Sequence, residues 1–184
     1  TFGGLNFIEF LKDSVIVSPL RIKPEIMNEL MSNLLLVDTK ETRLSANIIA
    51  RQQEAYKREE REVIESLHYI KELATQMKNA LLLGNLKDFG KLLHQEWVNK
   101  QKLDTMIANE RIRNIYEEAL KSGALGGKLI GAGGGGHFLL YCESGKKTSI
   151  AGEIKKMGCD VVPFDIETSG LQSWKINDNG AVQV

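Results

Sequence analysis

A run of glycines in the last third of the chain limits the fold more than any other feature of the sequence. Five of the six residues from 131 to 136 are glycine, and Ala132 is the exception. Glycine loses more backbone entropy on folding than any other residue, and it adds no side chain to a core. We therefore expect a loop at 131–136 whose backbone approaches another group closely.

The run satisfies the G-x-G-x-x-G pattern of dinucleotide-binding folds in form only. That fingerprint needs a helix that opens at its third glycine, because the helix N-terminus receives the pyrophosphate. Here an apolar segment typical of a strand follows Gly136. A Walker loop does not fit either, since no Lys-Ser or Lys-Thr pair closes the run and Lys128 precedes it. Two interpretations remain: free backbone N–H groups that bind an anion, or glycines that only permit a tight crossover from helix to sheet.

Periodic apolar residues predict a mixture of strands and helices over the rest of the chain. Alternating or continuous apolar runs predict strands at residues 5–10, 15–17, 34–37, 137–142, 160–166 and 171–176. Helical spacing predicts a helix after Pro24, helices through most of residues 42–122, and a short helix over 150–157. This order of elements favours an α+β fold, with helices packed against a largely antiparallel sheet in a single domain over residues 1–184.

Finer signals mark the boundaries of the helices. Gly84 is expected to end a long helix, and Asn109 is expected to cap the start of a later one. The charged run of residues 57–62 is expected to be a solvated helix face, because opposite charges recur there at favourable steps. Residues 123–136 are expected to form a loop that leads from a helix into the following strand.

Charge and composition argue against several classes of partner. The 24 basic and 24 acidic side chains balance, so no bulk field gathers nucleic acid or an anionic membrane. Cys142 and Cys159 lack metal-ligand spacing and are too few for a disulfide framework, so we expect two buried free thiols. No apolar run approaches the ~20 residues that span a bilayer. We expect a soluble cytoplasmic protein without a metal-ligand set of its own.

The glycine run lies inside a longer signature. Residues 123–136 resemble the third signature of the GHMP kinases, Gly-Ala-x-Gly-x-Lys-x-x-Gly-Ala-Gly-x-Gly-Gly, and meet every fixed position of it. The residues that resemble the D-glycero-D-manno-heptose 7-phosphate kinase branch of this family are Phe2 to Phe7, Leu92-Leu93-His94, Trp97, Lys100, and the helix capped by Asn109 with Tyr116 and Ala119. The resemblance runs from Thr1 to about Tyr141.

The resemblance implies a fold, a site and cofactors. The implied fold is the GHMP kinase C-terminal domain, a ferredoxin-like core with helical insertions. The implied active-site loop, next to the transferred phosphate, comprises Lys128, Gly131, Ala132, Gly133, Gly134, Gly135 and Gly136. The implied substrate-binding residues are Gly3, Gly4, Thr42, Arg43 and His94. The implied cofactors are ATP and Mg²⁺.

Two of the substrate candidates have a structural alternative. Arg43 ends a segment, 39–43, that matches a family pattern Thr-Gly-x-x-Arg, and its planar fork suits a sugar phosphate. A surface arginine at the start of a helix explains Arg43 equally well. Lys40 replaces the glycine of the pattern, and a left-handed backbone there would be strained. His94 shares a helical face with Trp97, and a histidine packed in the core is the stronger interpretation.

Two parts of a complete kinase of this family do not occur in the sequence. The nucleotide loop, a Pro-x-x-Gly-Leu-Gly-Ser-Ser type segment, is absent. The catalytic aspartate of the family would lie just upstream of Thr1, so no catalytic residue is assigned within this chain. Phosphoryl transfer depends on groups from both lobes. We therefore expect an N-terminal ATP-binding domain to be missing, and this half to be inactive or nearly so without it.

The leading functional hypothesis is an ATP-dependent sugar kinase that phosphorylates the anomeric hydroxyl of D-glycero-D-manno-heptose 7-phosphate, for lipopolysaccharide biosynthesis. Three alternatives stay open: another sugar 1-kinase of the fucokinase type, a non-catalytic binding or regulatory module, and a nicotinamide-dependent oxidoreductase. The last of these requires a helix after Gly136. The expected partners are a sugar phosphate, ATP and the missing N-terminal domain, and a homodimer stays open.

Overall fold

The computed structural model describes residues 2–41, 45–173, 175–176 and 182–183. Contacts divide the chain into two compact units, which we call unit 1 (Thr1–Arg21 with Phe164–Val184) and unit 2 (Ile22–Pro163). Unit 2 contains the glycine run. The candidates Thr42 and Arg43 lie outside the described residues.

Unit 1 contains the predicted N-terminal hairpin. Its strands are β1 (Asn6–Phe10), β2 (Val15–Pro19), β7 (Lys175–Ile176) and β8 (Val182–Gln183). Strand β1 pairs antiparallel with β2, and β7 pairs antiparallel with β8. The N–H of Gly4 donates to the carbonyl of Glu167 at 2.7 Å, which joins the two segments of this unit. The hairpin prediction is confirmed, whereas the strand expected over 171–176 is confirmed only at β7.

Unit 2 is built around a four-stranded sheet in which all neighbouring strands run antiparallel. Its strands are β3 (Leu34–Asp38), β4 (Ala124–Leu129), β5 (His137–Cys142) and β6 (Asp160–Val162). Their order across the sheet is β4-β5-β3-β6. Because the chain runs from β3 through helices to β4 and β5, then through one helix to β6, this is the β-α-β-β-α-β arrangement of a ferredoxin-like core. The predicted α+β class is confirmed.

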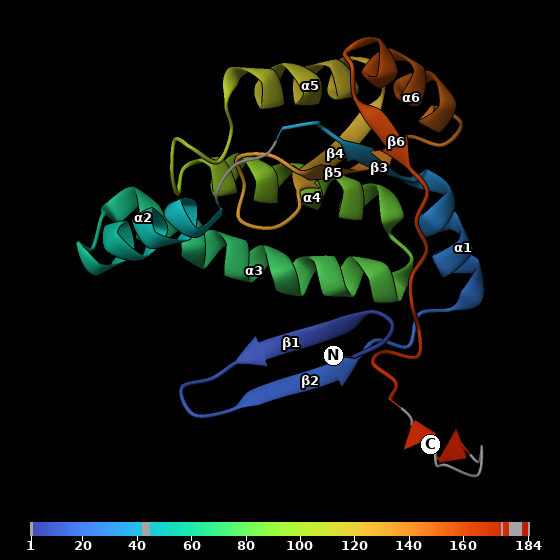
Figure 1. Cartoon of the computed structure of the whole chain (residues 1–184), viewed down its shortest axis with the longest axis horizontal. Coiled ribbons are helices and arrows are strands. Elements are labelled where there is room, and N and C mark those ends of the chain that lie inside the picture. Colours follow the sequence, from blue (N-terminus) through green and yellow to red (C-terminus); the bar gives the residue numbers. More distant parts are fainter. Residues whose placement is uncertain (1, 42–44, 174, 177–181, 184) are drawn as a thin grey trace. The chain divides into compact units, whose positions relative to one another are not determined.

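The described part of unit 2 holds six helices. They are α1 (Pro24–Asn33), α2 (Ser45–Lys57), α3 (Arg61–Leu83), α4 (Leu86–Gln101), α5 (Glu110–Lys121) and α6 (Lys147–Lys156). Helices α2 to α5 form the long connection between β3 and β4. Figure 1 shows α3 beside α4 and α5 beside α6, and α4 packs against the edge strand β4.

Local sequence explains where two of the helices begin and end. Gly84 ends α3 in a left-handed conformation, with φ 74° and an N–H that donates to the carbonyls of Ala80 and Leu81. Asn109 caps α5, because its side-chain oxygen accepts a hydrogen bond from the N–H of Ile112 at 2.8 Å. Both predicted boundaries are confirmed.

Two predictions about element boundaries were wrong. Residues 124–129, expected to belong to a loop, form the strand β4, so the glycine run joins two strands rather than a helix and a strand. The charged run at 57–62, expected to be a continuous helix face, contains the turn between α2 and α3, with Glu59 at φ 55°. Neither segment has the apolar periodicity that shows where an element starts or ends.

Aromatic side chains fix the start of β5 in the core. Trp97 of α4 and Tyr116 of α5 both contact Phe138, with ring centroids 5.2 Å and 5.5 Å away. All three side chains are buried. Phe138 follows Gly136 by two residues, so the end of the glycine run is tied to the core of unit 2.

Both cysteines, Cys142 and Cys159, have the free, buried state that the sequence predicts. Burial raises the pKa of the Cys142 thiol to about 11. Among the described residues, no helix combines the length and the apolar character that a membrane span requires.

Candidate functional site

The glycine run forms the loop between the antiparallel strands β4 and β5. Its five glycines all have positive φ: 83° at Gly131, 110° at Gly133, 80° at Gly134, 156° at Gly135 and 93° at Gly136. This region of φ favours glycine, which has no Cβ. A strand and not a helix follows the run, which excludes the dinucleotide fingerprint and, with it, the oxidoreductase hypothesis.

Two separate segments hold the middle and the exit of the loop in place. The N–H of Gly134 donates to the carbonyl of Ile107 at 2.8 Å, and the N–H of Gly136 donates to the carbonyl of Glu41 at 2.8 Å. The carbonyl of Gly136 accepts from the hydroxyl of Thr39 at 2.7 Å and from its N–H at 2.9 Å. The middle and the exit of the loop are therefore fixed by the segments before α5 and after β3.

Close packing explains two of the glycines. A Cβ at Gly133 would lie 3.0 Å from the Cα of Ile107, and a Cβ at Gly135 would meet the carbonyl of Glu41. A Cβ at Gly131 would meet nothing within 4 Å. Packing therefore requires glycine at Gly133 and Gly135, whereas at Gly131 only the backbone conformation does.

Several N–H groups of the loop are left for another partner. Within the described part of the chain, the N–H groups of Gly131, Ala132, Gly133 and Gly135 donate to no acceptor. Backbone N–H groups gathered in such a loop form concavities that bind anions. The loop therefore has backbone donors that a phosphate group could accept from.

A buried cluster of charges lies where α4 meets β4. Lys128 Nζ is 2.6 Å from Glu96 Oε1, and Glu96 is 7% exposed. Lys100 is 9% exposed, and its Nζ donates to the carbonyls of Leu129 at 3.1 Å and Gly131 at 2.5 Å. Lys128 thus lies on β4 beside a carboxylate, and Lys100 contacts the loop directly.

Burial changes the acidity of two groups near the loop. Burial, together with repulsion by Lys128, lowers the pKa of Lys100 to about 8, and the attraction of Glu96 opposes this change. Burial raises the pKa of Tyr116, so its phenol stays protonated. Lys100 therefore titrates closer to neutral pH than an exposed lysine does.

His94, a substrate candidate, is packed between α4 and α5. Its Nδ1 lies 2.8 Å from the hydroxyl of Tyr116, and the two rings stack with centroids 5.9 Å apart. A Cβ at Gly126 would lie 2.7 Å from the backbone N of His94, so this glycine lets β4 approach α4. These contacts pack the half-buried His94 against Tyr116, and its role toward substrate stays a prediction.

Lys40 follows β3 and has a left-handed backbone with φ 58°, as expected from the glycine that it replaces in the family pattern. Its Nζ pairs with Asp38 Oδ2 at 2.9 Å and with Asp160 Oδ2 at 2.6 Å. Hydrogen bonds to Asp160 and Asp38 raise the pKa of Lys40, and the bond to Lys40 lowers the pKa of Asp38. Two carboxylates thus hold this side chain at a strained position.

The remaining substrate candidates lie in unit 1 or outside the described residues. Gly3 and Gly4 lie in unit 1, where Gly3 packs against the backbone of Thr168. Thr42 and Arg43 lie outside the described residues, directly after the segment 39–41 that holds Gly136. The structure therefore brings together the glycine run, Lys128 and segment 39–41, and the roles of the other candidates stay predictions.

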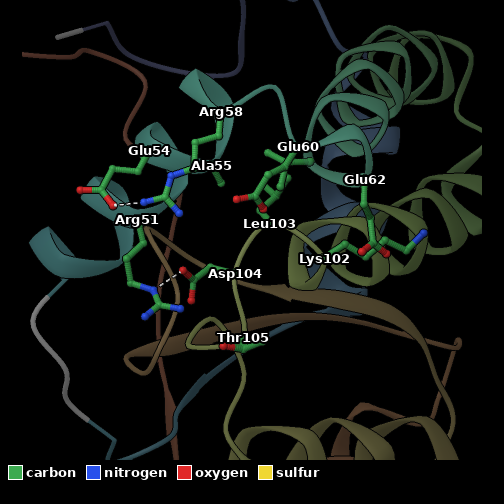
Figure 2. A pocket seen from close by; sticks show the side chains of 11 residues that line it. Arg51, Glu54, Ala55, Arg58, Glu60, Glu62, Lys102, Leu103, Asp104 and Thr105 are labelled. Carbon is green, nitrogen blue, oxygen red and sulfur yellow. Dashed lines mark hydrogen bonds and ion pairs between the residues drawn. The ribbon is translucent and has the colours of Figure 1, made fainter.

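A second feature of unit 2 is a polar pocket of about 450 Å³ near the end of α2, the start of α3 and residues 102–105 (Figure 2). Its charged lining residues are Arg51, Glu54, Arg58, Glu60, Glu62, Lys102 and Asp104. Arg51 Nε pairs with Asp104 Oδ2 at 2.6 Å. The carbonyl of Asp104 accepts from the N–H of Ile107 at 3.1 Å. The segment that lines this pocket therefore also supports the glycine loop.

Sequence reasoning missed the residues that hold the loop. Glu96 and Lys100 carried a signal, because their spacing puts two charged side chains on the apolar face of α4 beside Trp97. Ile107 and Glu41 act through backbone carbonyls, which no side-chain pattern shows. Thr39 lies in the family segment, although its contact with Gly136 depends on how β3 and β5 pair.

Comparison with known proteins gives a consistent result. Residues 77–158 match the family described as GHMP kinases C terminal. The D-glycero-alpha-D-manno-heptose 7-phosphate kinase of Campylobacter jejuni is 33% identical over 96% of this chain and 52% of its own length. The bifunctional fucokinase/GDP-fucose pyrophosphorylase of Arabidopsis thaliana is 28% identical over 87% of this chain and 14% of its own length.

Solved structures show the same fold. A crystal structure described as a D-glycero-D-manno-heptose 1-phosphate kinase from Bacteroides thetaiotaomicron has a TM-score of 0.68 and 31% identity, and the match covers 96% of this chain and 47% of that one. The mevalonate kinase of L. major has a TM-score of 0.70 over 84% of this chain and 45% of its own, and its 18% identity shows the fold alone. The chain thus spans about half the length of the heptose kinases that it matches. The matched segment, the 123–136 signature and the ferredoxin-like core together assign residues 77–158 of this chain to the GHMP kinase C-terminal family.

Proposed function

We propose that this chain is the C-terminal half of an ATP-dependent sugar kinase that phosphorylates the anomeric hydroxyl of D-glycero-D-manno-heptose 7-phosphate. The observation that carries the proposal is a glycine loop in which several backbone N–H groups have no acceptor among the described residues. The chain that contains this loop is similar over 96% of its length to the Campylobacter jejuni heptose 7-phosphate kinase. In this role the enzyme works in the cytoplasm and supplies heptose for lipopolysaccharide biosynthesis.

The loop has a defined part in this reaction. Its N–H groups donate hydrogen bonds to phosphate oxygens. Fixed donors of this kind stabilise the charge that spreads over a transferring phosphoryl group. Mg²⁺ would neutralise further charge on the ATP phosphates. We assign Mg²⁺ binding to the phosphates of ATP and to the N-terminal half, because such enzymes hold this ion through one or two carboxylates and the phosphates of the substrate.

Unit 1 supports the proposal that a second half is needed. Its hairpin exposes large apolar side chains on a pair of strands, and a two-stranded hairpin is marginally stable by itself. These side chains are Ile8, Phe10, Val15 and Ile16 on the strands and Leu11 in the turn between them. An N-terminal domain that covers them would also supply the nucleotide loop and the catalytic aspartate that the family uses. This half should therefore be inactive alone.

One rival function has an observation in its favour. The Arabidopsis fucokinase relative aligns with 87% of this chain, which supports another sugar 1-kinase of the fucokinase type. A non-catalytic binding or regulatory module would retain the fold and the glycine loop without turnover. The choice between these functions rests on which sugar is phosphorylated, and on whether any is.

The test measures ADP release from Mg-ATP with a panel of sugars: heptose 7-phosphate, heptose 1-phosphate, fucose and galactose. The chain alone is compared with the chain mixed with a separately expressed N-terminal half. Turnover only in the mixture, and greatest with heptose 7-phosphate, is the expected result. Turnover greatest with fucose would favour the rival kinase. If neither sample releases ADP although the two halves associate, the result would contradict any catalytic role.

A further inference from the structure

Lys100 reaches the entrance of the glycine loop, beside the backbone hydrogen bond from the N–H of Ile130 to the carbonyl of His137 at 2.8 Å. The middle of the loop is fixed by the carbonyl of Ile107, and its exit by Thr39 and Glu41. At its entrance, the Lys100 ammonium bridges two carbonyls on either side of Ile130, those of residues 129 and 131. Among the described residues, no other side chain is bonded to the first half of the loop.

The neighbours of Lys100 explain why its ammonium points to the loop. Glu96 lies four residues earlier on α4, the spacing at which a glutamate and a lysine pair along a helix. Lys128 occupies that carboxylate instead, at 2.6 Å from Oε1. Lys128 also repels Lys100. The ammonium of Lys100 therefore finds its acceptors in the two loop carbonyls.

The cluster also carries a net charge. Two lysines and one glutamate give a formal charge of +1 beneath the loop, and the other oxygen of Glu96, Oε2, is buried with no hydrogen-bond partner among the described residues. Positive charge beside an anion-binding loop favours a bound phosphate, more so in a buried environment than in water. Orientation of the loop and attraction of its ligand thus depend on the same buried group.

We propose that Lys100 is a positioning residue: its buried ammonium fixes the entrance of the glycine loop, so that the N–H groups of residues 131–133, which have no acceptor among the described residues, face one ligand. The identity of that ligand as a phosphate rests on the proposed function. Lys100 need not touch the phosphate or the sugar, because it acts through the carbonyls of Leu129 and Gly131.

The test compares Lys100→Met with the wild-type chain by hydrogen–deuterium exchange of residues 130–136, without nucleotide or sugar. Methionine fills a similar space and donates no hydrogen bond. The hydrogen-bonded amides of this segment, those of Ile130, Gly134 and Gly136, should exchange about tenfold faster or more, because a hydrogen bond from a charged donor contributes on that scale, while α5 and β5 keep their wild-type protection. Lys91→Met removes an exposed lysine of the same helix, which pairs with Asp88, and should leave the loop unchanged. Unchanged loop exchange in a folded Lys100→Met chain, or faster exchange everywhere, would overturn the proposal.

A pH profile gives a readout that a merely structural role would not change. After correction for the intrinsic pH dependence of amide exchange, wild-type loop exchange should rise as the pH passes about 8, the pKa of Lys100 beside Glu96 and Lys128. In Lys100→Met this step should be missing. If the variant does not fold, the wild-type profile decides, and a flat profile contradicts the proposal. Neither measurement uses ATP or sugar, so its failure is distinct from a failure of the kinase assignment.

Discussion

At Lys40, a side chain other than glycine occupies a left-handed backbone conformation, with φ 58°. Such conformations are costly for residues that carry a Cβ. The ion pairs with Asp38 and Asp160 act on the same residue, and both partners are partly or largely exposed. The backbone strain lowers the stability of the folded chain, whereas the ion pairs raise it. Substitution of Lys40 can separate the two effects.

We expect Lys40→Ala to be less stable than Lys40→Gly. Both variants lose the two ion pairs, but only alanine retains the backbone strain. The midpoints of urea unfolding of the two variants measure the difference. Equal midpoints would mean that the left-handed backbone at this position is not costly.

The pKa of Lys100 predicts a dependence of stability on pH. This pKa is about 8 in the folded chain and 10.5 for an unburied lysine, so between these values the unfolded chain binds more protons. The free energy of unfolding should therefore rise with pH across this window, by about 3 kcal/mol from this group. Urea unfolding of wild type and Lys100→Met from about pH 7 to 10.5 isolates the effect, because other groups titrate alike in both. A constant difference between the two chains would contradict the lowered pKa.

At the scale of elements, the contact between α4 and β4 depends on the absence of side chains. A Cβ at Gly126 of β4 would meet the carbonyl of Gly90 and the backbone N of His94, both on α4. A strand and a helix that touch through their backbones have no flexible side chain to move aside. The distance between these two elements, and with it the reach of Lys100 to the loop, is therefore fixed by Gly126.

We expect Gly126→Ala to destabilise the chain by about 3 kcal/mol or more, because overpacking against backbone forces the elements apart. Gly152→Ala is the matched control. Gly152 lies inside α6 and a Cβ there would meet nothing within 4 Å, so alanine should stabilise the chain by about 1 kcal/mol. Thermal or urea unfolding measures both changes. A Gly126→Ala chain as stable as wild type would show that β4 and α4 can separate freely.

Sequence periodicity predicted most elements, and its failures have a physical cause. The strand at His137 to Cys142 and the helix end at Gly84 were recovered because apolar residues and a left-handed glycine mark them. Strand β4 was missed because Gly126 and Gly127 give it little strand propensity; its place depends on pairing with β5 and on packing by α4. These are long-range contacts, which a local pattern does not contain.

The candidate site was predicted in part for the same reason. The glycine run itself is visible in the sequence, because five glycines in six residues require an explanation. Its supports come from segments near residues 40, 100 and 107, far apart along the chain. Two of the supports are backbone carbonyls, whose use is independent of residue type. Only folding of the sheet brings them to the loop.

At the scale of the whole molecule, the two units differ in how they bury apolar surface. Unit 2 encloses an aromatic and aliphatic core around Trp97 and Phe138. Unit 1 presents a hairpin in which Phe10 is 79% exposed. Exposed apolar side chains gathered on one element mark an interaction surface, and the proposed N-terminal half is the partner that this surface would fit.

Phe10→Ser should therefore weaken binding of the separately expressed N-terminal half by about tenfold or more, because a buried phenylalanine contributes roughly 2 kcal/mol. The thermal midpoint of the chain alone should stay at the wild-type value, since Phe10 is exposed. Leu83→Ser is the control, because Leu83 of α3 is 73% exposed in the other unit. Titration calorimetry measures the affinity of both variants for the N-terminal half. If Phe10→Ser binds as tightly as wild type, or if Leu83→Ser loses as much affinity as Phe10→Ser, the hairpin is not the docking element.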